Sequence, residues 1–205
     1  RSLAGVKAAD LGFRLGPRIN AAGRLSSARV AIELLLTDSY RAALDIAKKL
    51  NDENRSRQEV ERGIELANEY SDIVIAVNVG NEALVSWTDH LVGIDTVISY
   101  VKQVKSSISQ PVTVAENFAW WAESGRKLAK KLDFMTVHSY PIWEGKDIDE
   151  ALSFTIENID AVRDALPGIE LIIGEIGWAT TASEFGPRAS EENQLRYFKE
   201  INQWA

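Results

Sequence analysis

Two glutamates, Glu82 and Glu175, each follow a segment that is predicted to be a buried β-strand. In proteins built on parallel strands, active sites gather at the carboxyl ends of the strands, because loops and helix N-termini meet there. Two carboxyl groups on different strands suit glycoside hydrolysis, in which one protonates the leaving oxygen and the other attacks the sugar or activates water. Glu82 and Glu175 are therefore candidates for such a catalytic pair, as is Glu116 at the end of a third predicted strand.

Other polar and aromatic side chains lie at the ends of the same predicted strands. Hydroxyl, amide and carboxyl groups bind sugar hydroxyls, and a flat indole face packs against the C–H face of a sugar ring. On these grounds Asn81, His138, Tyr140 and Trp178 are candidates for substrate binding. A histidine at this position is also typical of a hydrogen-bonded strand end, so His138 is a candidate for sugar binding only.

The elements that must position these residues alternate along the second part of the chain. Short β-branched runs predict strands, and apolar residues at helical spacing predict helices between them. The predicted strands are 73–77, 111–114, 134–137 and 169–173, and the predicted helices are 91–108, 125–132, 147–166 and 190–204. This order predicts an α/β fold with a parallel sheet and right-handed crossovers, either a piece of a (β/α) barrel or a small doubly wound sheet.

The first part of the chain has a different character. Glycines and a proline interrupt residues 12–23, and a long helix is predicted over 40–69, polar on all sides at 51–59. Residues 1–70 carry 12 basic and 10 acidic side chains, a balance of +2, whereas the remainder carries −9 and all six tryptophans. This shift predicts two domains, a helical segment at 1–65 and an α/β segment at 66–205.

Composition excludes several classes of protein. No apolar run approaches the roughly 18–20 residues of a membrane span, so we expect no membrane insertion. The absence of cysteine excludes disulfide scaffolds, thiol catalysis and thiolate metal sites. The net charge of −7 argues against a large nucleic-acid-binding surface. The chain opens Arg1-Ser2-Leu3 without a signal-peptide pattern, which indicates a trimmed or excerpted sequence.

Four ordered motifs in residues 64–205 resemble glycoside hydrolase family 17. Val79 to Glu82 and Gly174 to Trp178 resemble its acid/base and nucleophile signatures on barrel strands 4 and 7, and Val112 to Glu116 and Val137 to Pro141 resemble its strands 5 and 6. The resemblance implies Glu82 as general acid/base and Glu175 as nucleophile. It further implies that Asn81 bonds the sugar 2-OH or the nucleophile, that Tyr140 orients the nucleophile, and that Glu116 and Trp178 line a sugar subsite. The implied substrates are β-1,3-linked glucans, without a cofactor or metal.

Residues 1–65 resemble a different family. Gly12 to Leu25, with the core from Arg18 to Arg24, is similar to a segment of RecJ-type single-strand-specific exonucleases of the DHH family, as is the stretch 50–55. The Asp-His-His metal motif of those nucleases is absent, and the chain has only two histidines, His90 and His138. We therefore expect no nuclease activity and interpret the chain as a chimera joined near 59–68.

The resemblance places only strands 4 to 7 of an eight-stranded TIM barrel in this chain, and thus predicts N-terminal helices followed by a half barrel. Strands 4 and 7 of a flat sheet lie about 14 Å apart, too far for one glycosidic bond. We therefore expect weak or no activity on a β-glucan or oligosaccharide. The alternative is a non-enzymatic chimera or fragment, with a residual RecJ-like, nucleic-acid-associated segment that lacks the metal ligands of the nuclease. Exposed sheet edges predict either a homodimer or coverage by the N-terminal helices.

Overall fold

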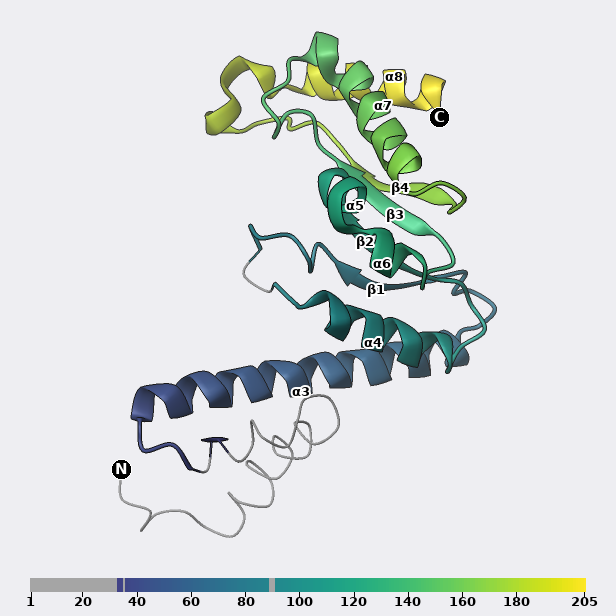
Figure 1. Cartoon of the computed structure of the whole chain (residues 1–205). Helices are drawn as coiled ribbons and strands as arrows, with labels where there is room; N and C mark the ends of the chain where they lie inside the picture. Colours follow the sequence, from purple (N-terminus) through teal and green to yellow (C-terminus); the bar gives the residue numbers. More distant parts are fainter. Residues whose placement is uncertain (1–32, 35, 89–90) are drawn as a thin grey trace. The chain divides into compact units, whose positions relative to one another are not determined.

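The computed structural model describes residues 33–34, 36–88 and 91–205 (Figure 1). The chain forms two compact units, Arg1–Leu66 and Ala67–Ala205. In the first unit the described residues are dominated by helix α3 (Tyr40–Glu69), which has the predicted bounds and ends three residues into the second unit. The central turns of α3 carry exposed ion pairs at helical spacing, Arg55–Glu59 and Arg62–Glu65, both at 2.9 Å. Such pairs support a helix whose middle is polar on all sides.

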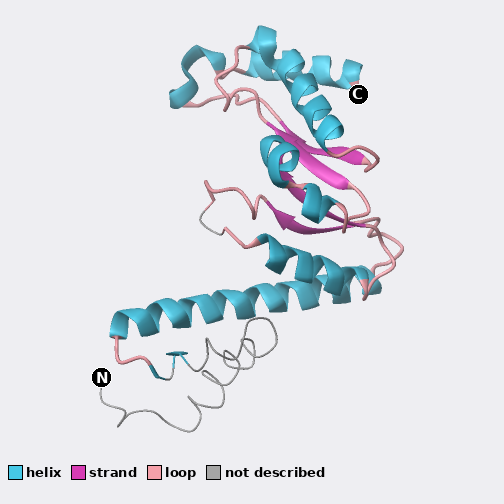
Figure 2. Ribbon diagram, in the orientation of Figure 1, coloured by secondary structure: helices cyan, strands magenta, loops and turns pink. Residues whose placement is uncertain are grey.

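The second unit is built on a four-stranded parallel sheet with the strand order β1-β2-β3-β4 (Figure 2). Helices lie between successive strands, so each connection is a crossover of the βαβ type. The strands are β1 (Val77–Asn81), β2 (Val112–Asn117), β3 (Met135–Ser139) and β4 (Leu171–Ile176). The other elements are α4 (Ile94–Lys105), α5 (Phe118–Ser124), α6 (Arg126–Ala129), α7 (Ile148–Ala165), the 3₁₀ helix η3 (Ser183–Arg188) and α8 (Glu191–Trp204). The predicted α/β class and half-barrel sheet are confirmed.

Hydrogen bonds identify which face of the sheet the helices cover. Asn158 of α7 donates to Ser139 Oγ at 3.1 Å, and Ser139 is fully buried. Side chains alternate along a strand, so Val137 points to the same face as Ser139, and His138 points to the other. Glu116 is the register partner of Val137 and shares its face. We call the two sides the helix face, with Val137 and Glu116, and the His138 face.

The first strand begins later than predicted. Residues 73–77 were expected to form it, yet the strand covers Val77–Asn81, and Ile73 and Ile75 are 70% and 87% exposed. The cause is the position of the neighbouring strand, because β2 starts only at Val112, which is the register partner of Val77. Residues before Val77 therefore have no strand beside them to complete a hydrogen-bond ladder.

Helix α5 was not predicted, and it occupies the segment that holds two adjacent tryptophans. Asn117 caps it by accepting a hydrogen bond from Ala119 N at 2.8 Å. Trp121 is fully buried, and its Nε1 donates to the carbonyl of Thr136 at 2.9 Å. One of the two tryptophans thus belongs to the core between helix and sheet. Within the described ranges, no helix has the length and apolar character to cross a membrane.

Candidate active site

A β-bulge precedes Glu82. Asn78 is the register partner of Thr113 and Asn81 that of Ala115, so β1 has one residue more than β2 over this stretch. Glu82 follows directly with a left-handed φ of 48°, and its backbone N donates to Ala115 O at 2.9 Å. Asn81 shares the face of Ala115, so regular alternation would send Glu82 to the helix face. The left-handed turn instead directs the Glu82 side chain to the His138 face, which is a recognised use of bulges near active sites.

A second bulge precedes Glu175. Between the register pairs of Ile173 and Glu175, strand β4 has one residue more than β3, and that residue is Gly174. A Cβ at Gly174 would lie 2.2 Å from Thr136 Cγ2 and 3.3 Å from His138 Nε2. Only glycine leaves room for both side chains. The extra residue places Glu175 beside His138 instead of on the helix face.

Both carboxylates converge on one imidazole nitrogen. His138 Nδ1 lies 3.1 Å from Glu82 Oε1 and 3.5 Å from Glu175 Oε2, and His138 is only 1% exposed. The two oxygens are therefore separated by at most 6.6 Å, the sum of 3.1 Å and 3.5 Å. Retaining glycosidases hold their carboxyl groups about 5–5.5 Å apart, a separation that lies below this upper limit.

The expectation that a four-stranded sheet leaves the carboxyls too far apart is wrong. That expectation used the spacing of strand axes, about 14 Å from the first strand to the fourth. The left-handed turn at Glu82 and the bulge before Glu175 direct both side chains inward from the two outer strands, and His138 lies between them on β3. The distance between the two carboxyl groups depends on the direction of the side chains, which the spacing of the strands does not determine.

Tyr140 contacts the second carboxylate directly. Its hydroxyl donates to Glu175 Oε2 at 2.9 Å. Burial, followed by this hydrogen bond and the charges of Glu175 and Glu82, raises the pKa of Tyr140 to about 12. The phenol therefore stays protonated and remains a donor across the neutral range. A Cβ at Gly177 would lie 3.1 Å from Tyr140 Cε1, so the missing side chain at Gly177 gives the Tyr140 ring its space.

Glu116 lies apart from the pair. It is fully buried on the helix face, and its Oε1 accepts a hydrogen bond from Leu84 N at 2.9 Å. Burial raises the pKa of Glu116 to about 7, with a smaller contribution from the charge of Glu82 and an opposing one from backbone N–H groups of residues 83 and 84. The side chain thus contacts the loop that follows Glu82, and the predicted sugar-binding role of Glu116 stays a prediction. Asn81 is exposed at the end of β1, directly before Glu82.

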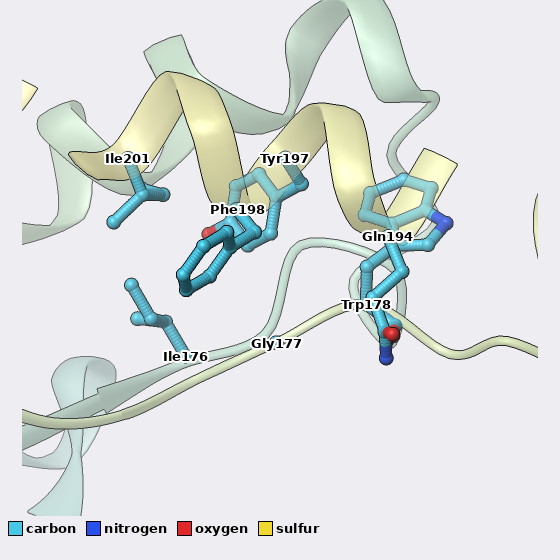
Figure 3. A pocket seen from close by; sticks show the side chains of 7 residues that line it. All are labelled: Ile176, Gly177, Trp178, Gln194, Tyr197, Phe198 and Ile201. Atoms are coloured by element: carbon cyan, nitrogen blue, oxygen red, sulfur yellow. The ribbon is translucent and has the colours of Figure 1, made fainter. Parts of the chain in front are cut away.

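Trp178 belongs to an apolar cluster between the end of β4 and α8. Trp178 is 3% exposed, its Nε1 donates to Arg188 O at 2.7 Å, and its ring centroid lies 6.0 Å from that of Tyr197. A pocket of about 180 Å³ opens beside it, lined by Trp178, Tyr197, Phe198, Ile201 and three neighbours (Figure 3). This pocket is apolar and does not include the two glutamates. The sugar-binding role of Trp178 also stays a prediction.

Sequence reasoning missed an aromatic pair, exposed Trp143 and half-buried Phe185, on the loops that follow β3 and β4. Trp143 is 64% exposed, and its ring meets that of Phe185 edge to face at 4.7 Å between centroids. Both residues come after strand ends and so lie on the same rim of the sheet as the glutamates. The available signal was a tryptophan three residues after Tyr140. In the described residues, no group of three or more acidic or histidine side chains is arranged to hold a metal ion.

The model of one protein family, the BtgE/BtgC glycoside hydrolase domain, matches residues 33–205. Among solved structures, an active-site mutant of Rhizomucor miehei β-1,3-glucanosyltransferase in complex with laminaritriose is 25% identical, with a TM-score of 0.62 over 78% of this chain and 64% of that one. The glycoside hydrolase family 17 β-1,3-glucanosyltransferase from Rhizomucor miehei is 26% identical, with a TM-score of 0.60 over 76% and 62%. The chain therefore spans slightly less than two thirds of the length of either structure.

A second, shorter similarity concerns a different protein. The single-stranded-DNA-specific exonuclease RecJ of Dickeya dadantii is 47% identical over 66 residues, which are 32% of this chain and 12% of that protein. The chain is thus similar to two unrelated proteins, which supports its interpretation as a chimera. Residues 1–32, which carry most of the RecJ-like motif, lie outside the described residues.

Proposed function

Since the chain belongs to the BtgE/BtgC glycoside hydrolase domain family, we propose that it holds the carboxyl pair of a retaining enzyme acting on β-1,3-linked glucans. Glu82 is the general acid/base and Glu175 the nucleophile. The observation that carries the proposal is the shared contact with His138, which keeps the two carboxylate oxygens within 6.6 Å, the sum of 3.1 Å and 3.5 Å. That separation suits a direct attack by one carboxylate on the sugar.

The two glutamates would act in a double displacement. Glu175 attacks the anomeric carbon while Glu82 donates its proton to the departing glycosidic oxygen, which leaves a glycosyl ester on Glu175. Glu82, now ionised, takes a proton from water or from a sugar hydroxyl, and that oxygen attacks the anomeric carbon and frees Glu175. Water as acceptor gives hydrolysis, and a second glucan chain gives transfer.

Neighbouring donors support these roles. Tyr140 donates a hydrogen bond of 2.9 Å to one Glu175 oxygen, which fixes the direction in which the nucleophile points. His138 Nδ1 lies within reach of both carboxylates, so one N–H can follow the negative charge as it moves from Glu175 to Glu82. The buried position of His138 limits its rotation and keeps this geometry stable.

The substrate class is inferred from the relatives and from the rim of the sheet. The two similar structures are β-1,3-glucanosyltransferases, one of them in complex with laminaritriose. The exposed indole of Trp143, which meets the half-buried ring of Phe185 edge to face, offers apolar surface for further sugar rings beyond the cleavage point. Asn81, exposed beside Glu82, is proposed to bind the 2-OH of the sugar that is cleaved.

Azide rescue of alanine variants tests the two roles separately. The substrate is an aryl β-laminaribioside with a dinitrophenyl leaving group, which needs little acid assistance. Glu175→Ala should lose at least about 1,000-fold in turnover, and azide should restore product as the α-glycosyl azide, because the anion attacks where the nucleophile is missing. Glu82→Ala should give the β-glycosyl azide, because azide then opens the glycosyl ester.

Glu157→Gln is the matched control, since Glu157 is an exposed carboxylate on α7. It should leave turnover unchanged and form no azide adduct. Equal rates in the parent, Glu175→Ala and Glu157→Gln would overturn the proposal and favour the non-enzymatic chimera. The opposite anomers from the two alanine variants would exchange the roles of Glu82 and Glu175.

A further inference from the structure

Glu116 presents an unexplained feature on the helix face of the sheet. It is fully buried, and within the described residues its Oε2 has no hydrogen-bond partner. A carboxyl group in such a place loses hydration without full compensation, and an apolar side chain would avoid that loss. Its Oε1 accepts a hydrogen bond from Leu84 N at 2.9 Å. The interaction that accounts for a carboxyl group at this position is thus its hydrogen bond to the loop that begins at Glu82.

That loop contains a strained turn. Glu82 has a φ of 48°, a left-handed conformation that is unfavourable for a residue with a side chain and persists only where its surroundings enforce it. Two successive residues of β2 hold the turn from both sides, since Ala115 O accepts from Glu82 N at 2.9 Å and Glu116 Oε1 accepts from Leu84 N. Thr88 Oγ1 adds a hydrogen bond to Glu82 O at 3.2 Å.

We propose that Glu116 is a positioning residue for Glu82, because it fixes Leu84 from the helix face and thereby maintains the turn that aims the Glu82 carboxyl at the His138 face. The proposal rests on the acid/base role of Glu82 only for its catalytic consequence. The positioning itself is a property of the fold. Glu116 would not contact the sugar, because it lies on the side of β2 away from His138 and is closed off from solvent.

Three substitutions separate the hydrogen bond from the volume of the side chain. Glu116→Gln keeps an oxygen acceptor at the same reach, whereas Glu116→Met keeps the volume without an acceptor. Glu116→Asp withdraws the oxygen by one methylene and serves if Glu116→Met does not fold. Thr155→Val is the matched control, since it removes another buried hydrogen bond, the one between Thr155 Oγ1 and the Tyr197 hydroxyl at 2.6 Å, in the contact between α7 and α8.

The first readout does not require activity. Amide hydrogen exchange at Leu84 should be at least about 10-fold faster in Glu116→Met or Glu116→Asp than in Glu116→Gln, beyond any change shared with Thr155→Val. A crystal structure of Glu116→Met should show the Glu82–His138 contact, 3.1 Å in the parent, broken or lengthened. Unchanged Leu84 exchange together with an intact Glu82–His138 contact would overturn the proposal.

The second readout is kinetic. Loss of positioning should lower kcat on a laminari-oligosaccharide by about 10- to 100-fold with KM within about 2-fold, and Glu116→Gln should restore most of the rate. Thr155→Val should leave both constants within about 3-fold. Equal losses in Glu116→Met and Glu116→Gln would contradict a role through the acceptor oxygen. If the parent protein shows no turnover, the proposed function fails, and the exchange and crystallographic readouts still decide the positioning role.

Discussion

Replacing Glu116 by Gln should change how the stability of the protein depends on pH. Burial raises the pKa of Glu116 from 4.5 to about 7 in the folded protein. Between these two values the unfolded chain has released the proton and the folded protein still binds it. Rising pH therefore favours unfolding over this interval, and the loss is complete above about pH 7. A glutamine cannot titrate, so Glu116→Gln removes this dependence.

The size of the effect follows from the shift in pKa. A shift of about 2.5 pH units at about 1.36 kcal/mol each corresponds to about 3 kcal/mol of unfolding free energy. The parent should lose this amount relative to Glu116→Gln as the pH rises from 4 to 8. At pH 4 both side chains are neutral, so the difference between the two proteins there reports only the fit of the amide group.

Urea unfolding of both proteins at half-unit intervals from pH 4 to 8 measures this quantity. The difference between the two free energies removes the contributions of the other carboxyls and of His138, which both proteins share. We expect that difference to rise in favour of Glu116→Gln with a midpoint near pH 6. A difference that stays constant within about 0.5 kcal/mol would refute the reasoning, because it would mean that Glu116 ionises with its ordinary pKa in the folded protein.

Two further predictions concern the sheet. Gly174→Ala should destabilise the protein by about 1–3 kcal/mol, because its Cβ would lie 2.2 Å from Thr136 Cγ2. Thermal unfolding measures the effect, with Gly63→Ala as the control, since a Cβ at Gly63 meets nothing within 4 Å. Equal melting temperatures would contradict the role of the bulge. We also propose that two copies associate through the edge strands of the described sheet, where Ile172 of β4 is 47% exposed. Sedimentation velocity should then give about twice the chain mass of 22.7 kDa, Ile172→Lys should lower it, and a monomer at tens of micromolar would exclude the dimer.

The sequence predicted the order of strands and helices because hydrophobic periodicity reports burial directly. It also brought Glu82, Glu175, His138 and Tyr140 to one end of the sheet, since parallel strands end on the same edge. It could not assign Glu116 to a face. Glu116 follows the same kind of strand as the other residues, and only the register of β2 against β3 reveals that its side chain points to the helices.

The position of each glutamate depends on a local irregularity of its strand. Without its bulge, alternation would place Glu175 on the helix face, because Gly174 immediately before it lies on the His138 face. Asn81 also lies on the His138 face, and Glu82 reaches that face through the left-handed turn that follows Asn81. A glycine in a strand pattern is a signal for a bulge, and Gly80 and Gly174 both precede their glutamate by one or two residues. Gly174, which weakens the strand propensity of β4, thus leaves the space beside His138 in which Glu175 is placed.

The geometry of the pair is therefore a local property of four strands. Glu82 depends on β1 and on its contacts with β2, and Glu175 depends on the bulge of β4 against β3. His138 on β3 lies between them, and each of these contacts is made within residues 77–176. Barrel closure is thus not required to bring the two carboxyl groups close enough to act on the same glycosidic bond. What a half barrel lacks is surface that grips the remaining sugar rings, so reduced activity should appear as a raised KM for long glucans more than as a lowered kcat on short activated glycosides.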